Sequence, residues 1–222
     1  MGDNSFFLKL SVVLLAASIC TAASDADVHS LADAVDHHYN HLRSLECEFT
    51  ETYTGLGMDR TESGTLWLKK PGKMRWQYRS PNGKLFVSDG KEAWFYVAGD
   101  QQVRKTDVKK LDDMRSPLAF LLGKTKLEKE LLGLSFAPDV SPLTPGDVVL
   151  RGAPRNMTGR INQVILEITP EDSISRIVID SADGSTTAYR LSDQKENTPM
   201  TDSLFQFKVP PGTEMIEGNL DQ

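Results

Sequence analysis

Histidine, the side chain that most often builds metal and catalytic sites, is scarce in this sequence. Of its 222 residues four are histidine, and all four lie between positions 29 and 41. His37 and His41 are four residues apart, a spacing that can hold a metal ion on a helix. No third ligand follows at a suitable spacing, and the His-Glu-x-x-His motif is missing. We therefore expect no metal and no cofactor, and because every candidate base lies on one helix, no Ser-His-Asp relay.

Long apolar runs are lacking too. The run from Leu10 to Cys20 is too short to cross a bilayer. It follows a short start with Lys9 and precedes small residues, which is the pattern of a secretory signal peptide. We expect residues 1–23 to be this signal and residues 24–222 to form one domain in an exported compartment. A lipoprotein signal that ends at Cys20 is the alternative, and the bulky Ile19 before the cysteine argues against it.

Cysteine and positive charge are the remaining shortages. Without Cys20, Cys47 stands alone and no intramolecular disulfide can form. Cys47 shares a face of a predicted strand with Leu45 and Phe49, which favours a small buried side chain over a reactive thiol. The 25 Lys and Arg against 31 Asp and Glu give a formal net charge of −6. With no basic stripe, the sequence argues against nucleic acid as a partner.

What the sequence does contain is a block of aromatic strands between Gly64 and Val97, which holds all three tryptophans. Turn residues such as Asn82-Gly83 and Asp89-Gly90 separate four predicted antiparallel strands, 64–70, 73–79, 84–88 and 91–97. Strand alternation places one apolar face opposite a mixed one. The apolar face carries Leu66, Leu68, Met74, Trp76 and Tyr78, with Lys70 at its rim. From the pattern alone this is a half-buried sheet.

The rest of the chain supplies one long helix, short helices and more strands. A helical apolar stripe predicts a helix from Ser24 to Ser44, followed by a strand at 45–53 and a loop or wide turn at 54–61. A serine cap, a proline and a closing glycine mark a short, wholly apolar helix at 116–123, which includes Leu118, Phe120 and Leu121. A second short helix is predicted at 125–132.

Further strands are predicted at 101–106, 147–151, 160–169, 173–180, 185–192 and 203–209. Among them, Ile177 and Ile179 lie on one apolar face. About ten to eleven strands that each have one apolar face indicate an α+β, mainly β fold. We expect a strongly curved antiparallel sheet, or incomplete barrel, wrapped around the helices.

An ordered set of motifs now carries a resemblance. After the signal and the helix comes a Phe49-Thr50-Glu51 strand, and then the block Gly-Thr-Leu-Trp-Leu-Lys-Lys-Pro-Gly-Lys-Met-Arg-Trp that starts at Gly64. Val-Ser-Asp-Gly-Lys from Val87, Trp-Phe-Tyr from Trp94, the Ser116-Pro117 helix and a closing Phe-x-Val-Pro-Pro-Gly from Phe207 complete it. Over essentially the whole mature chain, this resembles the outer-membrane lipoprotein carrier proteins, the LolA family.

The resemblance implies a periplasmic chaperone rather than an enzyme: an incomplete antiparallel barrel under a helical lid, enclosing a hydrophobic cavity. It implies a monomer that takes acylated lipoproteins from an ABC-type release complex in the inner membrane and passes them to an outer-membrane acceptor lipoprotein where one exists. We expect the acyl chains to contact Leu66, Leu68, Met74, Trp76, Tyr78, Leu118, Phe120, Leu121, Ile177 and Ile179. Lys70 occupies the position of the arginine that latches the lid in the family, and lacks its planar five-donor fork.

Two other classes are compatible with parts of the sequence. A related exported lipid-binding or sensor half-barrel, similar to the acceptor or to a sigma-factor regulator, would share the fold. An acceptor would need acylation on an N-terminal cysteine, for which Cys20 is the candidate. An exported hydrolase is the other class, but the sequence has no nucleophile elbow and no suitably placed histidine.

Overall fold

The computed structural model describes residues 25–80, 82–108, 126–157 and 159–218. Its helical elements there are α1 (Asp25–His41), α3 (Leu127–Glu130) and the 3-10 turns η3 (Arg155–Met157) and η4 (Asp202–Phe205). Its strands are β1 (Ser44–Gly55), β2 (Met58–Lys69), β3 (Lys73–Ser80), β4 (Asn82–Asp89), β5 (Glu92–Val97), β6 (Gln102–Asp107), β7 (Leu131–Phe136), β8 (Val148–Pro154), β9 (Ile161–Ile168), β10 (Ile174–Ser181), β11 (Thr186–Glu196) and β12 (Glu214–Glu217).

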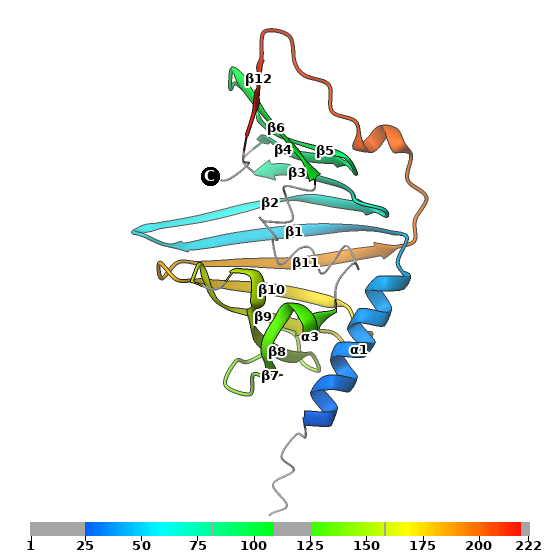
Figure 1. Cartoon of the computed structure of the whole chain (residues 1–222), viewed down its shortest axis with the longest axis vertical. Helices are drawn as coiled ribbons and strands as arrows, with labels where there is room; N and C mark the ends of the chain where they lie inside the picture. The colour runs from blue at the N-terminus through cyan, green and yellow to red at the C-terminus, as the bar shows by residue number, and fades with distance from the viewer. Residues whose placement is uncertain (1–24, 81, 109–125, 158, 219–222) are drawn as a thin grey trace, which may run out of the picture.

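All of these strands belong to one sheet that does not close. Their order is β12-β6-β5-β4-β3-β2-β1-β11-β10-β9-β8-β7, and they follow one another along the long axis of the molecule (Figure 1). Neighbours pair antiparallel except β12, which pairs parallel with β6. Since β12 and β7 remain as separate edges, the sheet is the predicted mainly β, incomplete barrel. No helix within the described ranges is long and apolar enough to cross a membrane.

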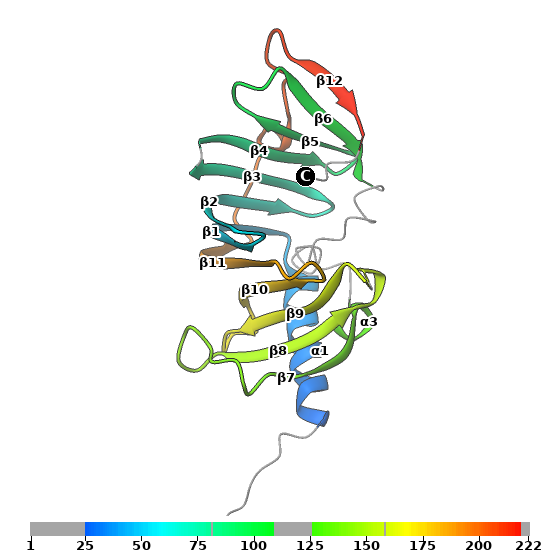
Figure 2. The same cartoon turned by 90° about the vertical axis from the view of Figure 1, so that its left-hand side faces the viewer.

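Helix α1 lies beside the β7–β11 half of the sheet and runs across the strand direction (Figures 1 and 2). Its predicted apolar stripe is confirmed, because Val28, Val35, Tyr39 and Leu42 are buried and Leu31 is partly buried. These side chains join the main hydrophobic core with one face of the sheet, which we call the inner face. Its buried members include Leu45, Cys47, Phe49, Leu66, Leu68, Trp76, Tyr78, Val164, Leu166, Ile177, Ile179 and Leu191.

The opposite, outer face of β3–β5 is covered by the chain that follows β11. Phe205 in η4 is fully buried, and the Arg75 guanidinium donates to the Leu204 carbonyl over 3.2 Å. The rings of Phe207 and Trp94 stack with centroids 6.1 Å apart. The chain then reaches β12 at the end of the sheet (Figure 1).

Three of the predicted elements are wrong, at 54–61, 203–209 and 125–132. The loop at 54–61 is instead a two-residue turn at Leu56-Gly57, with φ of 54° and 76°, so β1 and β2 extend to Gly55 and Met58. Two successive positive φ angles let a two-residue loop join the strands. The strand at 203–209 is instead η4 followed by irregular chain, because Phe205 and Phe207 alternate against the outer face without pairing.

The helix at 125–132 is present only as α3, because Leu131 and Leu132 begin β7, a strand the sequence did not predict. β12 is the other unpredicted strand, so the described residues hold twelve rather than ten to eleven. The helix predicted at 116–123, with Leu118, Phe120 and Leu121, lies outside the described residues.

Candidate functional site

The inner face of β1–β3 and β10 brings together most of the side chains predicted to contact acyl chains. Leu66 and Ile177 are fully buried, and Leu68, Trp76, Tyr78 and Ile179 are each less than 10% exposed. Met74 is partly buried against the same core. The register explains this, since Leu66 pairs with both Cys47 and Trp76, and Leu68 pairs with both Leu45 and Met74. A continuous apolar surface therefore crosses three strands.

An aromatic group lies at the centre of this surface. The Phe49 ring meets those of Trp76 and Tyr78 edge-on, with centroids 4.6 and 4.9 Å away, and Trp76 also meets Tyr189 at 5.9 Å. The Trp76 indole N–H donates to the Met74 sulfur over 2.8 Å. A thioether is a weak acceptor, so this donor is weakly held. The sequence placed Phe49 on the same strand face as Cys47, but it did not identify Phe49 or Tyr189 as a residue of the site.

Beyond the aromatic group the inner face becomes charged. Glu51 and Glu62 are 7% and 3% exposed and pair directly across β1 and β2. The Tyr78 hydroxyl donates to Glu51 over 2.9 Å. Lys84 donates to Glu62, and the Arg60 guanidinium lies 3.4 Å from it. We call these five residues the ionic end of the inner face. Sequence reasoning placed Tyr78 on the apolar face but did not find this group, because its four charged residues alone look like exposed polar positions.

Lys70, the predicted latch, contacts α1. Its ammonium group donates to the backbone carbonyl of Tyr39 in the last turn of the helix. That carbonyl belongs to the final turn, which lacks partners inside the helix, and a cation there also complements the helix dipole. Partial burial lowers the pKa of Lys70. The predicted contact with a lid involves residues outside those described, so the latch stays a prediction.

Helix α1 is fixed at two further points near its C-terminal end. The Tyr39 hydroxyl accepts a hydrogen bond from the Ile174 N–H over 2.9 Å, which ties the helix to β10. One turn earlier, both carboxylate oxygens of Asp36 lie 3.1 Å from the Leu127 N–H at the start of α3. Helix α1 is therefore bonded to Lys70 just after β2, to β10 and to α3.

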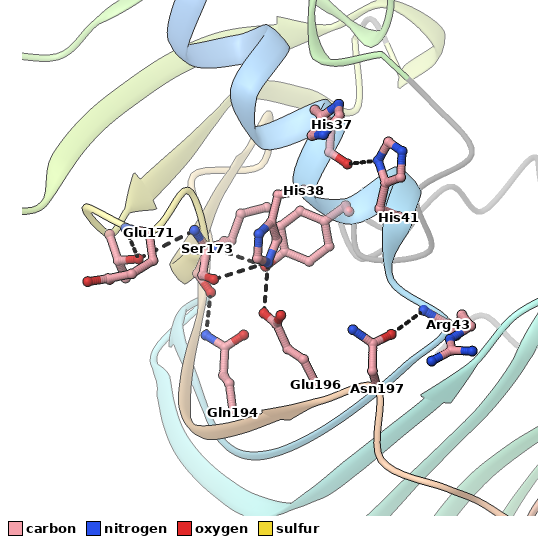
Figure 3. Close-up of polar contacts among 12 residues, drawn as sticks. His37, His38, His41, Arg43, Glu171, Ser173, Gln194, Glu196 and Asn197 are labelled. Carbon is pink, nitrogen blue, oxygen red and sulfur yellow. Dashed lines mark hydrogen bonds and ion pairs between the residues drawn. The ribbon is translucent and has the colours of Figure 1, made fainter.

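The histidines of α1 contact neighbouring carbonyl, carboxylate and hydroxyl groups. His41 Nδ1 donates to the His37 carbonyl over 2.7 Å, and both side chains are exposed as predicted (Figure 3). His38 is partly buried. Its Nε2 forms hydrogen bonds with the Glu196 carboxylate at 2.7 Å and the Ser173 hydroxyl at 3.3 Å. A relay needs the acid and the hydroxyl on different ring nitrogens. In the part of the chain that the structure describes, no group of three His, Cys, Asp or Glu could hold a metal ion.

Cys47 has the buried environment that its strand position predicts. It is 1% exposed and unpaired, and burial raises the pKa of its thiol to about 12. A thiol with so high a pKa is a poor nucleophile at neutral pH.

Comparison with known proteins now decides the family. The family model described as outer membrane lipoprotein carrier protein LolA matches residues 40–208 of the sequence. The chain belongs to the LolA family. The matched range covers the inner face, the ionic end and the outer-face segment around Phe205.

Relatives match over nearly the whole length of the chain. The outer-membrane lipoprotein carrier protein of Nitrosomonas europaea is 29% identical over 215 residues, covering 95% of this chain and 97% of that protein. The protein of the same name from Chromobacterium violaceum is 27% identical, with 96% and 98% covered. Among solved structures, the Mycobacterium tuberculosis lipoprotein LppX has a TM-score of 0.52 at 14% identity, covering 80% of this chain and 99% of that one. At that identity the likeness concerns the fold alone.

Proposed function

We propose that this protein is a periplasmic chaperone that binds the acyl chains of lipoproteins and carries them between the two membranes. The observation that carries the proposal is the family match over residues 40–208. The continuous apolar inner face supports it. In this assignment the protein is a carrier and not an enzyme.

The physical demand on such a carrier is large. Removing acyl chain from water is worth about 0.8 kcal/mol per methylene, so a chain of about sixteen carbons prefers apolar surroundings by on the order of 10 kcal/mol. Leu66, Leu68, Met74, Trp76 and Tyr78, with Ile177 and Ile179 beyond β11, would supply this surface. Flat aromatic and flexible thioether side chains suit a cargo that must also leave.

Binding in this proposal is an exchange. The inner-face side chains are almost completely shielded from solvent. They therefore have to become exposed before a cargo can contact them. Loading and opening are then one equilibrium, in which packing of the inner face within the protein competes with packing of the same side chains against the cargo. Lys70, and Leu118, Phe120 and Leu121 in the segment predicted to be the lid, would tune it.

The partners follow from the same role. An inner-membrane ABC-type complex would release the cargo and supply the energy, and an acceptor lipoprotein at the outer membrane would receive it. A monomer suffices for this exchange.

The test is release of lipoproteins from inner-membrane vesicles. Met74→Glu and Trp76→Glu place a charge on the apolar face, and we expect both to abolish release. Gln77→Glu is the matched control, because Gln77 is exposed on the opposite face of β3. Circular dichroism of each variant checks folding, and the half-buried Met74 should tolerate the change better than Trp76. Release at the wild-type level by folded Met74→Glu would overturn the assignment of this face.

A further inference from the structure

The ionic end is an unexpected feature of a surface that should hold hydrocarbon. Glu51 and Glu62 face each other directly across β1 and β2. Like charges in that position destabilise a sheet, and burying carboxylates costs further free energy. Both are nevertheless less than 10% exposed. Stability of the fold therefore does not explain why these two carboxylates are buried opposite each other.

The two carboxylates have different partners. Glu62 is paired with Lys84 and Arg60, so its charge is balanced. Glu51 accepts instead from the Tyr78 hydroxyl, and its charge also acts on the Tyr189 hydroxyl. Burial and the neighbouring Glu51 charge raise the pKa of both tyrosines, which therefore remain neutral donors. A carboxylate can accept about four hydrogen bonds, so Glu51 keeps capacity for another donor.

The change from apolar to ionic is abrupt and falls at the same level on adjacent strands. Along β1 the inner-face residues are Leu45, Cys47 and Phe49, followed by Glu51. Tyr78 bridges the boundary on β3, because its ring packs on Phe49 while its hydroxyl reaches Glu51. The inner face is therefore amphipathic along the strand direction, with the apolar part toward α1.

The dimensions of the apolar part suit an acyl chain. From Glu51 to Leu45 is six residues, or about 20 Å at the usual rise of a strand. The hydrocarbon core of a bilayer is about 30 Å thick and holds two layers, so one chain extends roughly 15 Å. A chain that begins at the ionic end can thus end within the apolar part.

We propose, on the basis of the carrier function above, that the cargo binds in one direction. The ester and amide linkages that join its acyl chains to the polypeptide lie at the ionic end, and the chains run along β1–β3 toward α1. Glu51 accepts from amide N–H groups of the cargo. Lys84 donates to its carbonyl oxygens. The ionic end then selects acylated polypeptide over hydrocarbon alone.

Photocrosslinking of the wild-type protein tests the direction. The probe is a triacylated cysteine lipopeptide with a diazirine either beside the acyl carbonyl or near the methyl end, and peptide mass spectrometry locates the label. We expect the first probe to label Glu51, Tyr78 and Tyr189, and the second to label Leu45, Leu68 and Met74. The reversed pattern, or the same pattern from both probes, overturns the proposal while leaving acyl binding intact. If neither lipopeptide binds, the carrier function falls, and this proposal with it.

A pair of variants tests the selectivity. Glu51→Gln should weaken lipopeptide binding about tenfold, because a carboxylate forms hydrogen bonds roughly twice as strong as those of a neutral amide. Binding of the hydrocarbon dye diphenylhexatriene should not change. Glu48→Gln is the matched control, since Glu48 lies on the same strand but pairs with Arg79 and Thr65 on the outer face. An equal loss for both probes, or no loss for the lipopeptide, would mean that Glu51 is only structural and would refute the selectivity.

Discussion

Replacing Lys70 by methionine should loosen α1 from the sheet. Methionine keeps an unbranched apolar stem, so the change removes little beyond the ammonium group that donates to the Tyr39 carbonyl. A hydrogen bond with a charged donor is worth about 1.5–3 kcal/mol. Lys70 is partly exposed, and water can take its place at the carbonyl. We therefore expect a loss of about 1–2 kcal/mol, of which the helix dipole contributes about 0.3–1.

Urea unfolding followed by circular dichroism measures this loss directly. In thermal unfolding of a domain of this size, 1 kcal/mol corresponds to about 2–4 °C. The melting temperature of Lys70→Met should therefore be roughly 2–8 °C lower. Lys70→Arg should lose less, because it keeps the charge and the donors. Lys91→Met is the control, since Lys91 is exposed at the β4–β5 turn. If Lys70→Met is no less stable than Lys91→Met, the hydrogen bond to Tyr39 contributes nothing to stability, and its role in holding α1 is refuted.

The same variant also reports on the carrier. If α1 has to shift for cargo to enter, destabilising the closed form by 1.4 kcal/mol tightens cargo binding up to tenfold. Titration of a triacylated lipopeptide against wild-type protein and Lys70→Met measures the change. Unchanged affinity together with reduced stability would mean that α1 stays in place during loading and that Lys70 is not a latch.

Four further perturbations test other parts of the structure. Phe49→Ala should cost about 3–5 kcal/mol in urea unfolding, because a buried ring is lost; a loss below 1 kcal/mol would contradict its central packing. Burial raises the pKa of Asp36 to about 6, so its proton favours the folded state at acid pH and this contribution disappears as the pH rises through 6. Between pH 4.5 and 7.5 the wild type should therefore lose stability relative to Asp36→Asn, and parallel urea midpoints would contradict this. Leu56→Asn should raise the melting temperature, because asparagine tolerates the left-handed backbone at this position and the change relieves about 1 kcal/mol of strain. A lower melting temperature would mean that the backbone of Leu56 is not strained. Phe205→Ala should expose the chain after β11 to limited proteolysis, and an unchanged digestion pattern would mean that the outer-face contacts do not hold it.

The sequence predicted most strands correctly because their signals are local. Turn residues such as Asp89-Gly90 and alternation around Trp76 fix a strand and its faces without reference to the rest of the chain. The two errors at 54–61 and 203–209 come from signals with two meanings. Glycine near Leu56 marks a tight hairpin as readily as a loop, and alternating phenylalanines mark burial whether or not the backbone pairs.

Features that depend on pairing between distant segments could not be predicted in this way. Strand β12 exists through its parallel pairing with β6, more than a hundred residues earlier. The contact from Lys70 to Tyr39 likewise needs the placement of α1. Lys70 could be located at the rim of the apolar face from alternation, but its partner could not.

The ionic end combines both cases. Alternation places Glu51 on the same face as Phe49, and sequence pattern alone assigns such a carboxylate to the exposed end of a strand. Only the register of β1 with β2 sets it opposite Glu62, and only the positions of β3 and β4 bring Tyr78 and Lys84 to them. Because the same register builds the apolar surface, a shift by one residue would move both sets of side chains to the other face. The apolar and ionic parts of the inner face are therefore one structural unit, and a ligand that fits the first meets the second at a fixed distance.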